Sequence, residues 1–429
     1  MSGTKHAGVL AIMGSGETSP TMVTAHRTLA GRLGAGRARA VLLDTPYAFQ
    51  ENVADISAKA IAYFRRSVGL TVEVCPAPDG EDLAASLAAI AAIRTADWLF
   101  AGPGSPTYAL TRWTNGATAS ALRERILHRR GLTVFASAAA ATMGRTALPV
   151  YEIYKAGSPA HWVDGLNLLE PLGLDVTVIP HYDNTEGGTH DTRYCYLGER
   201  RLAHLERQLP PDTALLGVDE HTAVIFDQHT GAVEIMGRGA LTVRRVGVST
   251  ILPAGTRLTL AELRALTRHG SGMVELTRAV PTEVPDSGHA PVTLVEITRA
   301  SEVAFDAAHG RRDAAGMVEA VLALESAIAD WGADTEEDEG TEQSRAILRD
   351  LITRLGDTVT PDAVHHLRPA VEPLLALRRH LRDQGAYPHA DAIRDALAAA
   401  GLTVRDIPGG TRWGIGTVPS VPRDRAAGT

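Results

Sequence analysis

The stretch LTVFASAAAATMG, residues 132–144, decides how the first part of the chain folds. Its apolar half predicts a buried strand, and the small residues that follow predict a sharp turn into a helix. Such a junction projects one side chain above the edge of a sheet, and here that side chain is Ser137. The stretch therefore indicates a nucleophile elbow, with the backbone N–H of Ala138 as a candidate oxyanion donor. A serine at such a junction can also be a helix N-cap, and this alternative stays open.

Further apolar runs surround this junction and alternate with helical stretches. They are VLAIMG, ARAVLLDT, TVEVC, ADWLFAG and DVTVIP, which begin at residues 9, 38, 71, 96 and 175. Strands that alternate with helices predict an α/β domain, here a parallel sheet in a three-layer α/β/α arrangement. A β-rich section completes this domain, to which we assign residues 1–255. Functional side chains are expected at the carboxyl ends of the strands.

His181 follows the run DVTVIP directly and begins a polar loop. Imidazole titrates near neutral pH, so a histidine at a strand end can act as general base for a nucleophile on a neighbouring strand. A histidine that only bonds locally within the loop is the alternative. The same loop carries Asp183, Glu186, His190 and Asp191, residue types that can bind a divalent metal. We nevertheless expect neither a metal nor a cofactor.

These features together resemble the peptidase E and cyanophycinase family of serine peptidases, which has a class I glutamine amidotransferase-like fold. The resemblance covers roughly residues 8–247 and includes, in order, LAIMGSGE at 10–17, WLFAGPGSPTYAL at 98–110, ASAAA at 136–140, PHYDN at 180–184 and LGVDEHTAVIF at 216–226. It implies a serine-type hydrolase that acts on a peptide or isopeptide bond, with acidic, Asp-containing substrates favoured.

The family pattern also implies roles for individual residues. It implies a catalytic triad of Ser137, His181 and a carboxylate, for which we select Glu152 because Ala147 stands where peptidase E has an aspartate. A surface pair of Glu152 with the nearby Lys155 is the alternative. The resemblance further implies an oxyanion site at Gly104 and Ala138, and substrate contacts by Asn184, Glu186, Arg193 and Glu220.

Two residues depart from the family's elbow. Phe135 and Ala139 stand where the family has glycines. A glycine tolerates backbone conformations and close approaches that other residues do not, so the geometry of the turn depends on where these two side chains go.

The second part of the chain has a helical period. We expect a connector at 256–299, a small α-helical domain at 300–415 and a disordered tail at 416–429. The stretch 374–413, LLALRRHLRDQGAYPHADAIRDALAAAGLTVRDIPGGTRW, resembles the carboxyl-terminal end of cysteinyl-tRNA synthetases. No synthetase nucleotide signature occurs in the sequence, so aminoacylation is not implied. Packing or homodimerisation is the expected role. RNA binding through Arg378, Arg379 and Arg382 is a less favoured alternative.

Composition limits the remaining choices. The net charge of −8 gives no overall attraction for nucleic acid, and no apolar run is long enough to span a membrane. The chain has two cysteines, Cys75 and Cys195, without paired spacing, which fits a reducing cytoplasm. Neither lies on an elbow, which argues against a glutamine amidotransferase. Two hypotheses follow: a hydrolase of a small peptide or amino-acid-derived substrate, or a degenerate scaffold that binds a ligand, tRNA or protein without turnover.

Overall fold

The computed structural model describes residues 8–34, 38–75, 83–187, 190–270, 293–332, 340–359, 363–407 and 410–416. The chain divides into two compact units. The first contains residues 1–299 and 324–345, and the second contains residues 300–323 and 346–429. Residues 417–429 of the predicted tail and residues 271–292 of the predicted connector lie outside the described residues.

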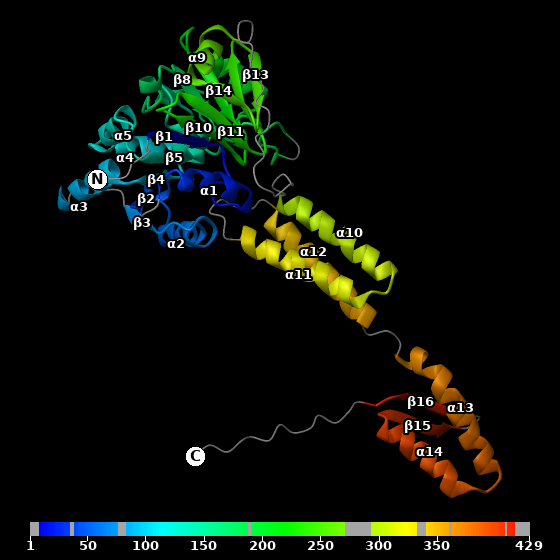
Figure 1. Ribbon diagram of the computed structural model, residues 1–429. Coiled ribbons are helices and arrows are strands. Elements are labelled where there is room, and N and C mark those ends of the chain that lie inside the picture. The colour runs from blue at the N-terminus through cyan, green and yellow to red at the C-terminus, as the bar shows by residue number, and fades with distance from the viewer. Residues whose placement is uncertain are drawn as a thin grey trace, which may run out of the picture. The chain divides into compact units, whose positions relative to one another are not determined.

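An eight-stranded sheet forms the centre of the first unit (Figure 1). The strand order is β14-β11-β10-β1-β5-β4-β2-β3. Strands β1, β5, β4, β2 and β3 are parallel to one another, whereas β10, β11 and β14 are antiparallel to their neighbours. The bounds are β1 (Val9–Met13), β2 (Ala40–Leu43), β3 (Val72–Cys75), β4 (Trp98–Ala101), β5 (Leu132–Ala136), β10 (Thr222–Asp227), β11 (Ala232–Gly237) and β14 (Arg257–Thr259). The predicted α/β class is confirmed.

Both faces of this sheet are buried because side chains alternate along each strand. In β1, Ala11 and Met13 join a core cluster with residues of α1 (Val23–Gly31) and α2 (Val53–Tyr63). Leu10 and Ile12 point the other way, into the cluster that also contains residues of the helices on the opposite face. These helices are α3 (Leu83–Thr95), α4 (Pro106–Thr114) and α5 (Thr118–Leu127).

A second sheet carries the later strands of the first unit. It has four strands in the order β13-β12-β9-β8. Strands β8 and β9 are parallel, with Ile179 opposite Gly217. The predicted strand at 175–180 therefore exists but belongs to this second sheet. The bounds are β8 (Val176–Ile179), β9 (Ala214–Val218), β12 (Ala240–Arg245) and β13 (Val248–Pro253). Because β8 and β9 are adjacent and parallel, residues just beyond their carboxyl ends are neighbours.

Short elements complete the first unit. They are η1 (Pro20–Met22), η2 (Thr45–Tyr47), η3 (Phe64–Val68), α6 (Ser137–Ala141), β6 (Thr146–Ala147), α7 (Val150–Tyr154), β7 (Val163–Asp164), η4 (Glu170–Leu172), α8 (Gly198–Glu206) and α9 (Leu260–His269). The part of the predicted connector before residue 271 is structured, since β14 pairs with β11 and Thr259 with Glu262 forms a capping box at the start of α9.

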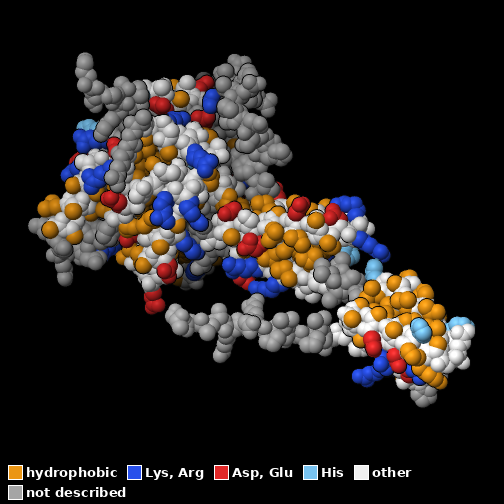
Figure 2. Space-filling view, turned by 60° about the horizontal axis from the view of Figure 1, so that its bottom comes forward, with side chains coloured by type: hydrophobic (Ala, Val, Ile, Leu, Met, Phe, Trp, Pro, Cys, Tyr) orange, Lys and Arg blue, Asp and Glu red, His pale blue; other side chains and the backbone are white. Residues whose placement is uncertain are grey.

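Helices α10 (Leu294–Gly310), α11 (Ala314–Trp331) and α12 (Thr341–Val359) follow. Residues 294–299 of α10, 324–331 of α11 and 341–345 of α12 belong to the first unit. A surface view shows hydrophobic side chains gathered over part of the helical region (Figure 2). The exposed large hydrophobic residues of these three helices include Val303, Val318, Leu322 and Ile352. No helix within the described ranges is both long and apolar enough to cross a membrane.

The second unit ends in two helices and a hairpin. These are α13 (Ala363–Asp383), α14 (Tyr387–Ala399), β15 (Leu402–Ile407) and β16 (Gly410–Ile415). The hairpin was not expected in a helical domain. It begins where Gly401, with φ of 82°, follows the end of α14, and Leu402 then packs against Val371 and Leu397. Arg378 is buried and donates to both carboxylate oxygens of Asp406 at 2.8 and 2.9 Å.

Candidate active site

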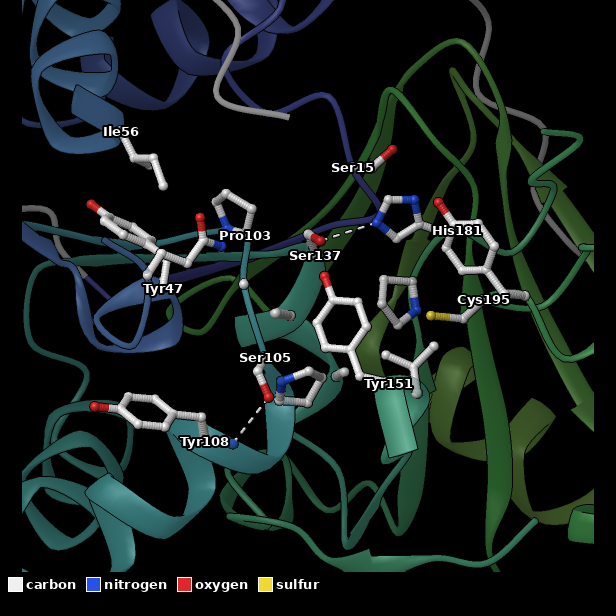
Figure 3. Close-up of a pocket in the computed structure, with 18 of the residues that line it drawn as sticks. Ser15, Tyr47, Ile56, Pro103, Ser105, Tyr108, Ser137, Tyr151, His181 and Cys195 are labelled. Carbon is white, nitrogen blue, oxygen red and sulfur yellow. Dashed lines mark hydrogen bonds between the residues drawn. The ribbon is translucent and has the colours of Figure 1, made fainter. Parts of the chain in front are cut away.

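Ser137 lies at the turn from β5 to α6, as the sequence predicts. Its φ is 45°, in the left-handed region, and the preceding Ala136 is extended. This conformation costs a residue other than glycine on the order of 1–3 kcal/mol, and such strain gathers at functional sites because the surrounding fold must enforce it. The side chain lines a pocket over the end of the central sheet (Figure 3). Ser137 therefore stands on a sharp turn between a strand and a helix, and its side chain lines the pocket.

The two departures from the family's elbow are accommodated. Phe135 is fully buried and turns away from the turn, with its ring 5.7 Å from that of Trp113. Ala139 does not have a positive φ, and its backbone N–H donates to the carbonyl of Gly102 at 3.2 Å. The strand can carry a bulky residue two positions before Ser137 because that side chain enters the core below the sheet.

His181 faces Ser137 across the pocket (Figure 3). The Ser137 Oγ to His181 Nε2 distance is 3.0 Å, and the His181 Nδ1 to Glu220 Oε1 distance is 2.9 Å. A carboxylate only accepts hydrogen bonds, so it favours the tautomer with the proton on Nδ1. The lone pair of Nε2 is then directed at the serine hydroxyl. The loop is held by the backbone N–H of Cys195, which donates to the His181 carbonyl at 3.0 Å.

Glu220 is fixed from several sides. Asn184 Nδ2 donates to the same Oε1 atom at 2.9 Å, and the backbone N–H of Glu220 donates to Asp183 Oδ1 at 2.7 Å. Burial alone would raise the pKa of Glu220, but the hydrogen bonds and charge of His181 and the hydrogen bond from Asn184 outweigh it. The pKa lies below its ordinary value, and Glu220 is ionised at neutral pH.

Glu152, which the sequence analysis selects as the third triad residue, does not contact His181. Its Oε1 atom accepts a hydrogen bond from Thr107 Oγ1 at 2.6 Å. Glu220, predicted as a substrate contact, is the carboxylate that contacts His181. The physical reason is strand order: His181 and Glu220 follow the ends of the parallel neighbours β8 and β9. The sequence signal was a carboxylate two residues beyond the apolar run that ends at Val218.

The other predicted site residues fall in different places. Asn184 is fully buried and contacts Glu220, so it supports the site from beneath. Glu186 lines the pocket and accepts a hydrogen bond from the Tyr196 hydroxyl at 2.7 Å. Arg193 is not among the pocket-lining residues; it pairs with Asp191 at 2.9 Å. No group of three or more metal-binding side chains with suitable placement occurs in the part of the chain that the structure describes.

The predicted oxyanion residues border the pocket beside Ser137. Ala138 is the second residue of α6, so its backbone N–H has no hydrogen-bond acceptor within the helix itself. Gly104 has φ of 131°, and a Cβ there would lie 2.1 Å from the carbonyl oxygen of Pro46. The next residue, Ser105, caps α4 and also lines the pocket (Figure 3). The turn at Gly104 therefore requires glycine.

The carboxyl-terminal part matches a known family. Residues 365–413 match the model of the cysteinyl-tRNA ligase anticodon binding domain. Over 48 residues the chain is 48% identical to the cysteine–tRNA ligase of Salinibacter ruber (strain DSM 13855 / M31), which is 11% of this chain and 9% of the ligase. The chain thus spans less than a tenth of the length of this curated relative. The predicted resemblance of the carboxyl-terminal part is confirmed.

Two solved structures are similar to the α/β part. A peptidase from an acI-B1 Actinobacterium is 20% identical with a TM-score of 0.47, over 60% of this chain and 98% of that one. A protein from Listeria monocytogenes EGD-e that carries the name peptidase E is 17% identical with a TM-score of 0.37, over 55% of this chain and 98% of that one. The fold class itself follows from the sheet order.

Proposed function

We propose that the first unit is a serine hydrolase that cleaves a peptide or isopeptide bond, with Ser137, His181 and Glu220 as its triad. One observation carries the proposal: Ser137 Oγ is 3.0 Å from His181 Nε2, while the opposite ring nitrogen is 2.9 Å from Glu220. This spatial order, in which the nucleophile contacts the base and the base contacts a carboxylate that orients it, is the arrangement that activates a serine.

In the proposed reaction, His181 takes the proton of Ser137 as the hydroxyl oxygen attacks the substrate carbonyl. Glu220 holds the tautomer and stabilises the imidazolium that forms. His181 then gives the proton to the leaving amine, and water repeats the attack on the acyl-enzyme. The backbone N–H of Ala138 and the turn at Gly104 are the proposed oxyanion donors, and each well-placed donor contributes about 3–4 kcal/mol to stabilisation of the transition state.

The proposed substrate is a short peptide or isopeptide with an acidic group. Lys59, Arg112 and Lys155 line the same pocket as Ser137 and supply positive charge. Asp55 and Glu152 also line it, so the two signs of charge are distributed along the groove. A mixed lining fits a zwitterionic peptide. Comparing hydrolysis of Asp-Leu, Asn-Leu and their β-linked isomers tests this, and equal rates for Asp-Leu and Asn-Leu would rule out acidic specificity.

The triad proposal is tested by labelling with a fluorophosphonate, which phosphonylates an activated serine. We expect an adduct on the parent protein at Ser137, located by peptide mass spectrometry, and none on the Ser137→Ala variant. Thr142→Ala is a suitable control because Thr142 is a buried hydroxyl residue on the same segment that bonds to the Ala139 carbonyl at 2.7 Å. Absence of a Ser137-dependent adduct would favour the degenerate-scaffold hypothesis.

For the carboxyl-terminal region we propose a packing role. The Arg378 guanidinium, one of three cations considered for RNA, is buried against Asp406. RNA binding by the exposed Arg379 is the alternative, and it predicts a salt-sensitive mobility shift with tRNA. A shift at low salt that Arg379→Ala abolishes would overturn the packing role.

A further inference from the structure

The last residue of α11, Trp331, contacts the loop that carries Glu220. Trp331 is only 4% exposed, and its ring meets the ring of His221 edge-on, with centroids 5.8 Å apart and an interplanar angle of 79°. Both residues belong to the first unit. His221 is the residue directly after Glu220, so this contact lies one residue from the carboxylate that faces His181.

His221 has a strained backbone that its surroundings must maintain. Its φ is 51°, in the left-handed region, which is unfavourable for a residue with a Cβ. On one side its Nδ1 atom lies 2.8 Å from Thr21 Oγ1 and 3.3 Å from Ser19 Oγ. A Cβ added at Gly16 would lie 2.3 Å from the same Nδ1, so the ring is tightly packed there. Trp331 contacts the imidazole as well.

The helical segment around Trp331 also borders the pocket. Trp331, Glu342 and Arg345 are among the residues that line it together with Ser137 and His181. Arg345 and Glu342 pair at 2.8 Å.

One further bond links two of these helix ends to each other, and a second bond links them to the rest of the first unit. Thr298 and Ser344, both buried, share a hydrogen bond of 2.8 Å. Glu296 at the start of α10 pairs at 3.0 Å with Arg238, which lies in the turn between β11 and β12. These contacts keep the helix ends near the loop of Glu220.

We infer that Trp331 is a positioning residue of the site: it holds His221 in its left-handed conformation and thereby keeps the carboxylate of Glu220 on His181. The inference rests on the proposed triad. It makes the first-unit part of α11 a component of the hydrolase, because Trp331 there supports the loop that orients the base. Residues 1–255 contain all three residues of the proposed triad but not Trp331.

The test replaces Trp331 in the full chain and measures the rate of fluorophosphonate labelling at Ser137. We expect Trp331→Ala to slow labelling by about 10-fold or more, because small displacements of catalytic groups have large effects on rate. Trp331→Phe should restore most of the rate, since phenylalanine also offers an edge-to-face contact. Leu322→Ala is the control: Leu322 lies on the same helix, is 58% exposed and is not among the residues that line the pocket.

A double-mutant cycle separates positioning from general damage to the fold. In a Glu220→Gln background, Trp331→Ala should add little further loss, because both changes act through the same carboxylate. Full additivity would overturn the inference. If Trp331→Ala loses its circular-dichroism spectrum, Trp331→Leu takes its place, since leucine keeps bulk without an aromatic edge. The inference would also be overturned if Trp331→Leu were labelled as fast as Trp331→Phe.

Amide hydrogen exchange gives a readout that does not need activity. Trp331→Ala should speed exchange at residues 219–222, whereas Leu322→Ala should not. If the parent protein forms no Ser137 adduct, the proposed triad fails while the exchange experiment still tests the support. Unchanged exchange at 219–222 in Trp331→Ala would refute the role of Trp331 whether or not the serine is reactive.

Discussion

Replacing Glu220 by glutamine is the sharpest test of the site. The substitution keeps the size of the side chain and an oxygen that can accept hydrogen bonds from His181 and Asn184, but it removes the charge. Serine attack turns His181 into an imidazolium, so the lost charge matters most in the transition state. The pair is largely protected from water: the side chains of His181 and Glu220 are 14% and 24% exposed.

The expected magnitude follows from this geometry. The Nδ1 to Oε1 distance is 2.9 Å, which places the centres of the two delocalised charges about 4 Å apart. At an effective dielectric constant of about 20, unit charges at that separation attract by about 4 kcal/mol. This corresponds to a rate lower by about a thousandfold, as an upper value, because each tenfold in rate is about 1.4 kcal/mol.

The assay is the second-order rate of fluorophosphonate labelling at Ser137, with hydrolysis of a peptide substrate as a second measure. Glu152→Gln is the matched control: it makes the same chemical change at a carboxylate that lines the pocket but bonds to Thr107. We expect that control to label at nearly the parent rate. A Glu220→Gln variant as fast as the parent, or a Glu152→Gln variant equally impaired, would refute the assignment of Glu220.

Three further predictions concern stability. Burial and nearby carboxylates raise the pKa of Asp219 to about 7. The folded state therefore loses stability as the pH rises from about 4, the pKa in the unfolded chain, to about 7, because a buried carboxyl group must then ionise. Asp219→Asn should raise the free energy of unfolding near pH 8 by about 1–3 kcal/mol and have no such effect near pH 4, measured by urea denaturation. Gly104→Ala should cost at least about 3 kcal/mol in thermal denaturation because of its close backbone contact, whereas Gly157→Ala, with φ of 76° and open space, should cost about 1 kcal/mol; equal costs would contradict the assigned turn. Arg378→Ala should weaken the second unit by about 2 kcal/mol, with faster hydrogen exchange at 402–415 and no such change in Arg379→Ala, because only the first arginine is buried in an ion pair.

Much of the fold could be predicted because its strands are short, apolar and bounded by turn residues. All six predicted strands occur, including β5 with its turn at Ser137. The sequence could not show that β8 joins a second sheet, since an apolar run looks the same in either sheet. The hairpin at 402–415 was not predicted either, because the helical period of the preceding residues favours a helix that continues through it.

The site was predicted in part. Ser137 and His181 meet as expected because both stand directly after strands, and strand ends gather at one edge. The identity of the carboxylate depends on which strands are neighbours, which local pattern does not reveal. Glu152 lies close to Ser137 in the sequence, whereas Glu220 is brought to His181 by the pairing of β8 with β9. The buried position of Phe135 likewise depends on the direction of a side chain within the sheet.

The residues of the proposed triad come from two sheets. Ser137 directly follows β5 of the eight-stranded sheet, and His181 follows β8 of the four-stranded sheet. Glu220 lies in the loop that leads from β9 of the four-stranded sheet to β10 of the eight-stranded sheet. The serine and the histidine are therefore carried by different sheets, and Glu220 lies where the chain passes from one sheet to the other. Phe135 of β5, Val178 of β8 and Leu216 of β9 belong to the same core cluster. Because that interior is closely packed, we expect a change of side-chain volume there to alter the distance between Ser137 and His181, and with it the reactivity of the serine, without changing any residue that faces the substrate.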